Sequence, residues 1–314
     1  MSFATLPQLN GRLFLSDGGM ETSLIYHDGV DLPQFAAFIL LRDSIGRQRL
    51  ADYYRLYLEL AAETPHAGFV LETPTWRASA DWGALLGYDE LALAEANKDA
   101  ASLVMELRDE WQSRIAGPVV VSGQIGPRGD GYVLAAPNSA EEAVNYHLPQ
   151  AVALRDGGVD MLSAMTMTSS AEAVGVARVG RTVGLPVSVS FTVETDGRLP
   201  SEERLRDAIE AVDADTPPDY FSVNCAHPSH FQACLAEGGS WTRRIRSIRA
   251  NASSCSHAEL DAATELDIGD PEELGDSYRR LKALLPALNV LGGCCGTDLR
   301  HLRAIRDAWI GTVA

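Results

Sequence analysis

The chain has 314 residues, 26 of them basic and 43 acidic, which gives a formal net charge of −17. This charge repels phosphate backbones and no basic run offsets it, so we expect no nucleic-acid partner. Hydrophobic residues make up 46% of the chain, but no apolar run approaches the length of a membrane span, so we expect no membrane partner either. The length suits two domains or one large α/β barrel.

The N-terminal segment and the cysteine content bear on location. Residues 1–7 lack a charged stretch followed by an apolar one, the pattern of a secretory signal. The chain has 5 cysteines, an odd number. We therefore predict a cytoplasmic protein, where thiols stay reduced and cysteine clusters more often bind metal or catalyse reactions than form disulfides.

Short apolar runs alternate with longer helical patterns along the whole chain. Most of the runs are continuous, which is typical of parallel strands buried on both faces. The seventh run is the weakest strand prediction because it carries several arginines. The predicted strands are Arg12–Asp17, Gly68–Thr73, Val119–Gly123, Val159–Met165, Pro186–Val193, Tyr220–Cys225, Arg243–Ala250 and Asn289–Gly292.

Helical periodicity and capping signals fill the segments between these strands. Apolar spacing predicts helices over Arg47–Glu63 and Asp89–Arg114. A Ser followed three residues later by Glu predicts helix starts at Ser139 and Ser169. Further helix starts are predicted at Asp270, which precedes a proline, and at Thr297 or Asp298.

Strands that alternate with helices favour a single-domain (β/α)₈ barrel over residues 1–314, with an open doubly wound sheet as the alternative. Active sites of the barrel fold form at the carboxyl ends of the strands. Residues far apart in the sequence would then meet at one mouth. The strand-end residues are Asp17, Thr73 to Trp76, Gln124, Met165, Cys225, Cys294 and Cys295.

The cysteines at two of these strand ends predict a metal site. Cys225 ends the sixth strand, and Cys294 and Cys295 follow the eighth within a Gly-Gly-Cys-Cys-Gly run. Flanking glycines let adjacent cysteines turn toward one ion, and three thiolates leave the fourth position of a tetrahedral Zn²⁺ open. The alternatives are a buried Cys225 with a coincidental or redox-active pair. Cys234 and Cys255 lack partners, and we interpret them as structural.

The ligand set also indicates a reaction. Three thiolates give bound zinc a net negative charge, so it is a weak Lewis acid. It would instead hold an incoming thiol as a nucleophilic thiolate at neutral pH. This favours alkyl transfer to sulfur over hydrolysis, which usually uses His or carboxylate ligands and a zinc-bound water.

These motifs resemble the zinc-dependent homocysteine S-methyltransferases over nearly the whole chain. The matching segments are 17–22 (DGGMET), 75–79 (TWRAS), 123–127 (GQIGP), 223–225 (VNC) and 292–297 (GGCCGT). The resemblance implies a (β/α)₈ barrel, zinc held by Cys225, Cys294 and Cys295, and homocysteine as acceptor with Asp17 at its amino group. It implies S-methylmethionine or a related sulfonium as donor, with betaine or a methylfolate in other members.

The chain departs from the family pattern at two strand ends. Met165 stands where the family carries a glutamate for the substrate amino group, and 249–254 (RANASS) replaces a Tyr-Pro-Asn-type motif. Glu72 or Glu194 is a candidate for the missing carboxylate. These departures leave open a different thiol acceptor with the same zinc chemistry.

We predict substrate-binding roles for Asp17, Trp76, Gln124, Thr166 and Asn224. A carboxylate beside a thiolate site suits an ammonium, and a Trp face suits a cationic donor. Turn capping and packing are the alternatives for these residues. The predicted function is a zinc-dependent S-methyltransferase whose partners are a small-molecule thiol and a methyl donor, with a homo-oligomer left open. A vicinal-dithiol redox or metal-buffering protein is the alternative.

Overall fold

The computed structural model describes residues 5–134 and 139–311. Within them, parallel strands close into a barrel in the order β1-β2-β3-β4-β5-β6-β7-β8. The strands are β1 (Phe14–Leu15), β2 (Gly68–Glu72), β3 (Val119–Ile125), β4 (Met161–Met167), β5 (Val187–Phe191), β6 (Tyr220–Asn224), β7 (Ile245–Ala250) and β8 (Val290–Gly293). The predicted (β/α)₈ barrel is confirmed and the open sheet is excluded, because β1 pairs with β8 as well as with β2.

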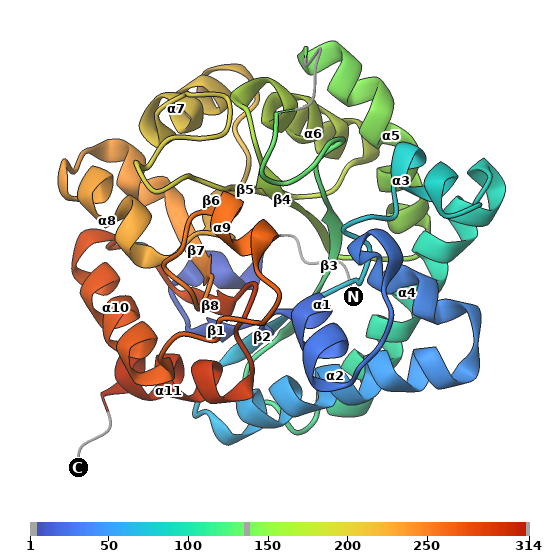
Figure 1. Cartoon of the computed structure of the whole chain (residues 1–314), viewed down its shortest axis with the longest axis horizontal. Helices are drawn as coiled ribbons and strands as arrows, with labels where there is room; N and C mark the ends of the chain where they lie inside the picture. Colours follow the sequence, from blue (N-terminus) through green and yellow to red (C-terminus); the bar gives the residue numbers. More distant parts are fainter. Residues whose placement is uncertain (1–4, 135–138, 312–314) are drawn as a thin grey trace.

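Helices surround the barrel (Figure 1). They are α1 (Met20–Thr22), α2 (Ser44–Glu63), α3 (Ala80–Leu85), α4 (Glu90–Trp111), α5 (Ala140–Asp156), α6 (Ser170–Val183), α7 (Leu205–Asp215), α8 (Pro228–Ala236), α9 (His257–Ala262), α10 (Pro271–Leu284) and α11 (Leu299–Ile310). The short α1 and α9 lie over the barrel mouth in Figure 1 rather than in the outer ring. None of the helices in the described ranges has the length and apolar character needed to cross a bilayer.

Local capping explains several helix starts. Ser139 and Glu142 form the predicted capping box of α5. Ser169 accepts a hydrogen bond from the Glu172 backbone at the start of α6. Asp270 caps α10, whose first residue is a proline, and Asp298 caps α11 as predicted. These caps satisfy backbone N–H groups that a helix start leaves without a partner.

Two apolar regions hold the barrel together. The main core lies between the strands and the outer helices, and includes buried Tyr54, Tyr57 and Tyr278. A smaller cluster, with Phe14, Met161 and Tyr220, fills the amino end of the barrel interior. The burial of Tyr54 and Tyr57 on α2 fits the apolar spacing that predicted a helix over Arg47–Glu63. The carboxyl end of the barrel is left for polar groups.

The seventh strand explains how a polar sequence enters a barrel. Arg243 and Arg244 lie in a short 3₁₀ helix (Ser240–Arg244) before β7, and Arg244 pairs with Asp213 of α7 at 2.8 Å. Arg249, near the end of β7, is only 6% exposed. Its guanidinium reaches across the barrel mouth to residues of the first two strand ends, so the strand is stable despite its arginines.

Candidate metal and substrate site

The three predicted zinc ligands meet at the carboxyl end of the barrel. Cys225 directly follows β6, and Cys294 and Cys295 directly follow β8. Their Sγ atoms all lie within 4.8 Å of one another. We call these three residues the thiol cluster. Among the described residues, it is the one group of His, Cys, Asp or Glu side chains with spacing suited to a metal ion.

The backbone at both strand ends is shaped to bring the sulfurs together. Cys225 has a φ of 52°, in the left-handed region that non-glycine residues rarely adopt. His257 Nε2 lies 2.7 Å from the Cys225 carbonyl oxygen and holds this turn. Gly19 must be a glycine, because a Cβ there would lie 2.5 Å from the Cys294 carbonyl oxygen.

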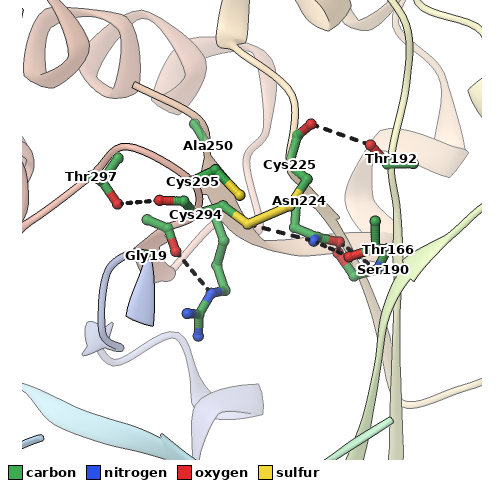
Figure 2. The surroundings of a disulfide bond; sticks show 12 residues. Gly19, Thr166, Ser190, Thr192, Asn224, Cys225, Ala250, Cys294, Cys295 and Thr297 are labelled. Atoms are coloured by element: carbon green, nitrogen blue, oxygen red, sulfur yellow. Dashed lines mark hydrogen bonds between the residues drawn. A yellow bond between two sulfur atoms is a disulfide. The ribbon is translucent and has the colours of Figure 1, made fainter. Parts of the chain in front are cut away.

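Cys225 and Cys294 are joined by a disulfide, with their Cα atoms 5.4 Å apart, while Cys295 stays free (Figure 2). Metal ligation needs thiolates, so this pair must be reduced before an ion binds. Once reduced, the three soft sulfur donors fit Zn²⁺, and three ligands leave a fourth position free. Burial, followed by the charge of Glu21, raises the pKa of the Cys295 thiol to about 11.

Asn224 links the thiol cluster to neighbouring strands through hydrogen bonds of its side chain. Its side-chain oxygen accepts hydrogen bonds from the Thr166 backbone at 2.8 Å and the Ser190 hydroxyl at 2.6 Å. Its amide nitrogen lies 2.8 Å from the Thr166 hydroxyl and 3.9 Å from Cys294 Sγ, as Figure 2 shows. Asn224 and Thr166, both predicted to bind substrate, therefore contact each other, and Asn224 also contacts the predicted zinc ligand Cys294.

A second cluster of charged side chains lies in the same barrel mouth. Arg249 lies 2.7 Å from both Asp17 and Glu72, and all three side chains are less than 10% exposed. We call these residues the Arg249 cluster. Burial opposes the charge of Arg249, but Asp17 and Glu72 outweigh it and raise its pKa. Burial raises the pKa of Glu72, and the Arg249 charge opposes this shift.

Both clusters line one pocket with a volume of about 210 Å³. The predicted Asp17, Trp76, Gln124, Thr166 and Asn224 all line it, together with Met165. Their proposed roles toward a substrate stay predictions. The carboxylates Asp130, Asp261 and Glu265 line the same pocket and make it acidic.

Two predicted substrate groups already have partners within the protein. The Gln124 amide nitrogen lies 3.3 Å from a Glu72 oxygen. The Arg77 guanidinium stacks 4.0 Å from the Trp76 ring centroid, so one face of this ring is covered. The Trp76 indole nitrogen is buried without a hydrogen-bond partner among the described residues.

The two candidates for the missing carboxylate differ in position. Glu72 lines the pocket but is paired with Arg249. Glu194 is not among the residues lining the pocket, and its carboxylate lies 2.6 Å from His257 Nδ1. Neither is a free carboxylate beside the thiol cluster.

The sequence did not single out several residues that line the pocket. Glu21 follows the Asp-Gly-Gly segment, and Arg77 follows Trp76. Tyr132 stacks on His257 with ring centroids 3.8 Å apart, and its hydroxyl lies 3.9 Å from Cys295 Sγ. The DGGMET and TWRAS segments already contained Glu21 and Arg77, but no spacing pattern marked either residue.

The chain forms a closed (β/α)₈ barrel with three cysteines at its mouth, and comparison with known proteins gives its family. The family model for homocysteine S-methyltransferase matches residues 14–309. The chain belongs to the homocysteine S-methyltransferase family, as the sequence resemblance predicted.

The chain is also similar to individual relatives. It is 25% identical over 315 aligned residues to the methionine synthases of Mycobacterium tuberculosis and Mycobacterium leprae. This match covers 96% of the chain but only 25% of either synthase, so the chain spans about a quarter of their length.

Solved structures share the fold. The homocysteine methyltransferase MmuM from Escherichia coli matches in its oxidized form with a TM-score of 0.76 and 21% identity, over 94% of this chain and 95% of that one. Its metallated form matches with a TM-score of 0.74 and 22% identity, over 94% and 96% of the two chains.

Proposed function

We propose that this protein is a zinc-dependent methyltransferase that moves a methyl group from a sulfonium or ammonium donor to a thiol, with homocysteine as the first acceptor to test. The observation that carries the proposal is the convergence of three cysteine sulfurs within 4.8 Å at one wall of an open pocket. Family membership supports the reaction class. A cytoplasmic location fits reduced thiols and stays a prediction.

The metal would activate the acceptor thiol, and the protein would hold the metal. Bound Zn²⁺ would lower the pKa of an acceptor thiol in its fourth position, so that the sulfur stays a thiolate at neutral pH. Cys225, Cys294 and Cys295 would hold the metal, with Asn224 orienting the Cys294 sulfur through its amide. The Tyr132 hydroxyl, 3.9 Å from Cys295 Sγ, would help to hold this ligand in place.

In the reaction, the acceptor proton leaves before methyl transfer. A sulfur lone pair of the acceptor forms the new S–C bond, and the bond between the methyl carbon and the donor atom breaks. The bonding electrons stay on the donor, which leaves neutral after losing its positive charge. The pocket contributes by holding both reactants in line, which can account for much of a rate increase.

The acidic mouth suits a cationic donor. Asp130 and Asp261 line the entrance, and the exposed rings of Tyr26 and Phe35 line it as well. Carboxylates raise the local concentration of cations, and aromatic faces attract a sulfonium or a quaternary ammonium. This supports S-methylmethionine or betaine as the first donors to test.

The test uses reduced, zinc-loaded protein with homocysteine, supplied first with S-methylmethionine and then with betaine. We expect methionine to form, to stop on chelation, and to return when zinc is added back. Turnover that continues at full rate in metal-free protein would contradict the zinc proposal. Zinc bound without methyl transfer to homocysteine would point to another thiol acceptor.

The disulfide between Cys225 and Cys294 favours one second candidate, a thiol redox or metal-buffering protein. Thiol titration with and without a chelator separates the two. Thiols that stay masked in reduced protein until a chelator is added support the metal enzyme. Thiols that react freely in both conditions support the redox protein.

A further inference from the structure

Arg249 is a buried positive charge of the pocket, and its hydrogen bonds are all made within the protein. Each of its five N–H bonds has an acceptor within the protein. The acceptors are the Gly293 carbonyl, the Ser16 hydroxyl, Glu72, Asp17 and the Gly18 carbonyl. A guanidinium has five donors, so Arg249 has none left for a substrate carboxylate. It serves the protein itself.

The same contacts occupy both carboxylate oxygens of Asp17, which leaves it less able to bind a ligand. One carboxylate oxygen accepts from Arg249, and the other accepts from the Tyr53 hydroxyl at 3.2 Å. Glu72 is likewise paired with Arg249 and accepts from Gln124. A positive charge 2.7 Å from each carboxylate weakens the attraction that either one exerts on a substrate ammonium.

Glu21 is a carboxylate of the same pocket that has no such cationic partner. It lies in α1, lines the pocket, and forms no ion pair within the part of the chain that the structure describes. Burial is the largest influence on it and raises its pKa to about 7. A hydrogen bond from its own backbone N–H lowers this pKa, the charge of Asp17 raises it, and the charges of Arg249 and Arg77 lower it.

Glu21 also lies on the side of the pocket where the thiol acceptor must bind. Its charge is the second-largest influence, after burial, on the Cys295 thiol. The backbone of Gly19, two residues earlier, packs against the Cys294 carbonyl. A group attached by a short chain to a sulfur at the thiol cluster is therefore within the region of Glu21.

We propose that Glu21 binds the ammonium group of the acceptor, so that the pocket selects an aminothiol whose cationic group lies a few bonds from the sulfur. The inference rests on the proposed thiol methyl transfer. It assigns to Glu21 the contact that the sequence resemblance assigned to Asp17. A partly buried carboxylate without a countercharge is costly, and a bound ammonium reduces that cost.

The test compares two thiols that differ only in the amino group, homocysteine and 4-mercaptobutyrate. Calorimetric titration measures their binding to reduced, zinc-loaded wild-type protein and to Glu21→Gln. We expect wild type to bind homocysteine roughly ten- to a hundredfold more tightly, which is the value of a hydrogen bond to a charged group. Glu21→Gln is expected to bind the two thiols almost equally.

Glu265→Gln is the matched control. It removes the same charge from an exposed position at the mouth of the same pocket. It should keep the wild-type preference for homocysteine. Equal binding of both thiols by wild type, an unchanged preference in Glu21→Gln, or the same loss in Glu265→Gln would each overturn the assignment.

Binding and methyl transfer are separate readouts in this design. If wild type discriminates between the thiols but transfers no methyl group, the proposed function fails while the assignment of Glu21 stands. If methyl transfer occurs and Glu21→Gln still prefers homocysteine, the assignment fails while the proposed function stands. Zinc content and thermal unfolding of each variant establish that it is folded and loaded.

Discussion

The thiol cluster and the Arg249 cluster lie in one pocket but satisfy their chemistry in opposite ways. In the Arg249 cluster every donor of the arginine has a protein acceptor, so the cluster is complete without a ligand. In the thiol cluster three soft donors converge and call for an ion from outside the chain. The first therefore stabilises the barrel mouth, and the second is the centre of the chemistry that we propose.

The sharpest test of the thiol cluster is Cys294→Ala. Removing one of three ligands should eliminate stoichiometric zinc and reduce methyl transfer to background, because two cysteines do not hold a catalytic zinc site. Metal analysis of the purified protein and a methionine-formation assay measure the two effects.

Cys234→Ala is the control for this loss. Cys234 lies in α8, and its thiol donates to the Phe231 carbonyl outside the pocket. The variant should keep both zinc and activity. Equal loss in the two variants would mean that any lost thiol disturbs the protein, and would remove the distinction between the cysteines.

The Arg249 cluster is broken by Arg249→Met, which leaves two buried carboxylates without their cation. We expect a loss of roughly 3–5 kcal/mol in the free energy of unfolding, the range for removing one partner of a buried ion pair. Chemical denaturation of reduced, zinc-loaded protein measures it. Adding Asp17→Asn to this variant should recover part of the loss, since one uncompensated charge disappears.

An exposed pair supplies the control for Arg249→Met. Arg178 and Asp215 are paired on the surface between α6 and α7, where water screens both charges. Arg178→Met should leave stability nearly unchanged. A comparable loss in both variants would contradict the view that burial, and not ion pairing alone, makes the Arg249 cluster important.

Sequence and structure agree most closely where the signal is local. The eight strands were predicted because continuous apolar runs are distinctive, although β1 is only Phe14–Leu15 within the predicted Arg12–Asp17. Cys225, Cys294 and Cys295 were selected because thiols at the ends of two strands of one barrel converge at its mouth. Both predictions depend on a residue type and its place in the chain.

The Arg249 cluster could not be predicted from the sequence, because it depends on contacts between residues that are far apart in the chain. Arginine in a strand sequence resembles a surface residue, and its burial depends on Asp17 and Glu72 from two other strands. Glu21 shows the same limit, because the absence of a partner is a property of the folded pocket. The spacing of residues along the chain shows neither which charges meet nor which stay alone.

The support that Asn224 gives the thiol cluster predicts a smaller effect. Asn224→Ala removes the amide beside Cys294 and the bonds to Thr166 and Ser190. Loss of such an orienting group typically weakens metal binding 10- to 100-fold, so we expect that range for zinc. Competition with a chelator of known affinity measures it. Ser190→Ala removes one of these bonds and should weaken zinc binding less. Equal weakening in the two variants would mean that the bond to Ser190, and not the amide beside Cys294, accounts for the effect.

Glu21 can be compared with Asp17 and Glu72, because it is a carboxylate of the same pocket but forms no ion pair within the described residues. Its pKa is raised from 4.5 to about 7, mainly by burial. A folded-state pKa above the unfolded value means that the native state binds the extra proton, so stability is highest below pH 4.5 and falls as pH rises through 7. The other influences on this pKa are a hydrogen bond from the Glu21 backbone and the charges of Asp17, Arg249 and Arg77.

We therefore expect Glu21→Gln to be more stable than wild type by roughly 1–3 kcal/mol at pH 8, with the difference shrinking as the pH falls toward 5. Denaturation curves at matched zinc content across this range measure it. The sign is opposite to that of Arg249→Met, although both substitutions remove one charge from the pocket. A destabilised Glu21→Gln at pH 8 would show that Glu21 has a partner in the folded protein. The cost of an unpartnered carboxylate would then no longer explain why a substrate ammonium binds there.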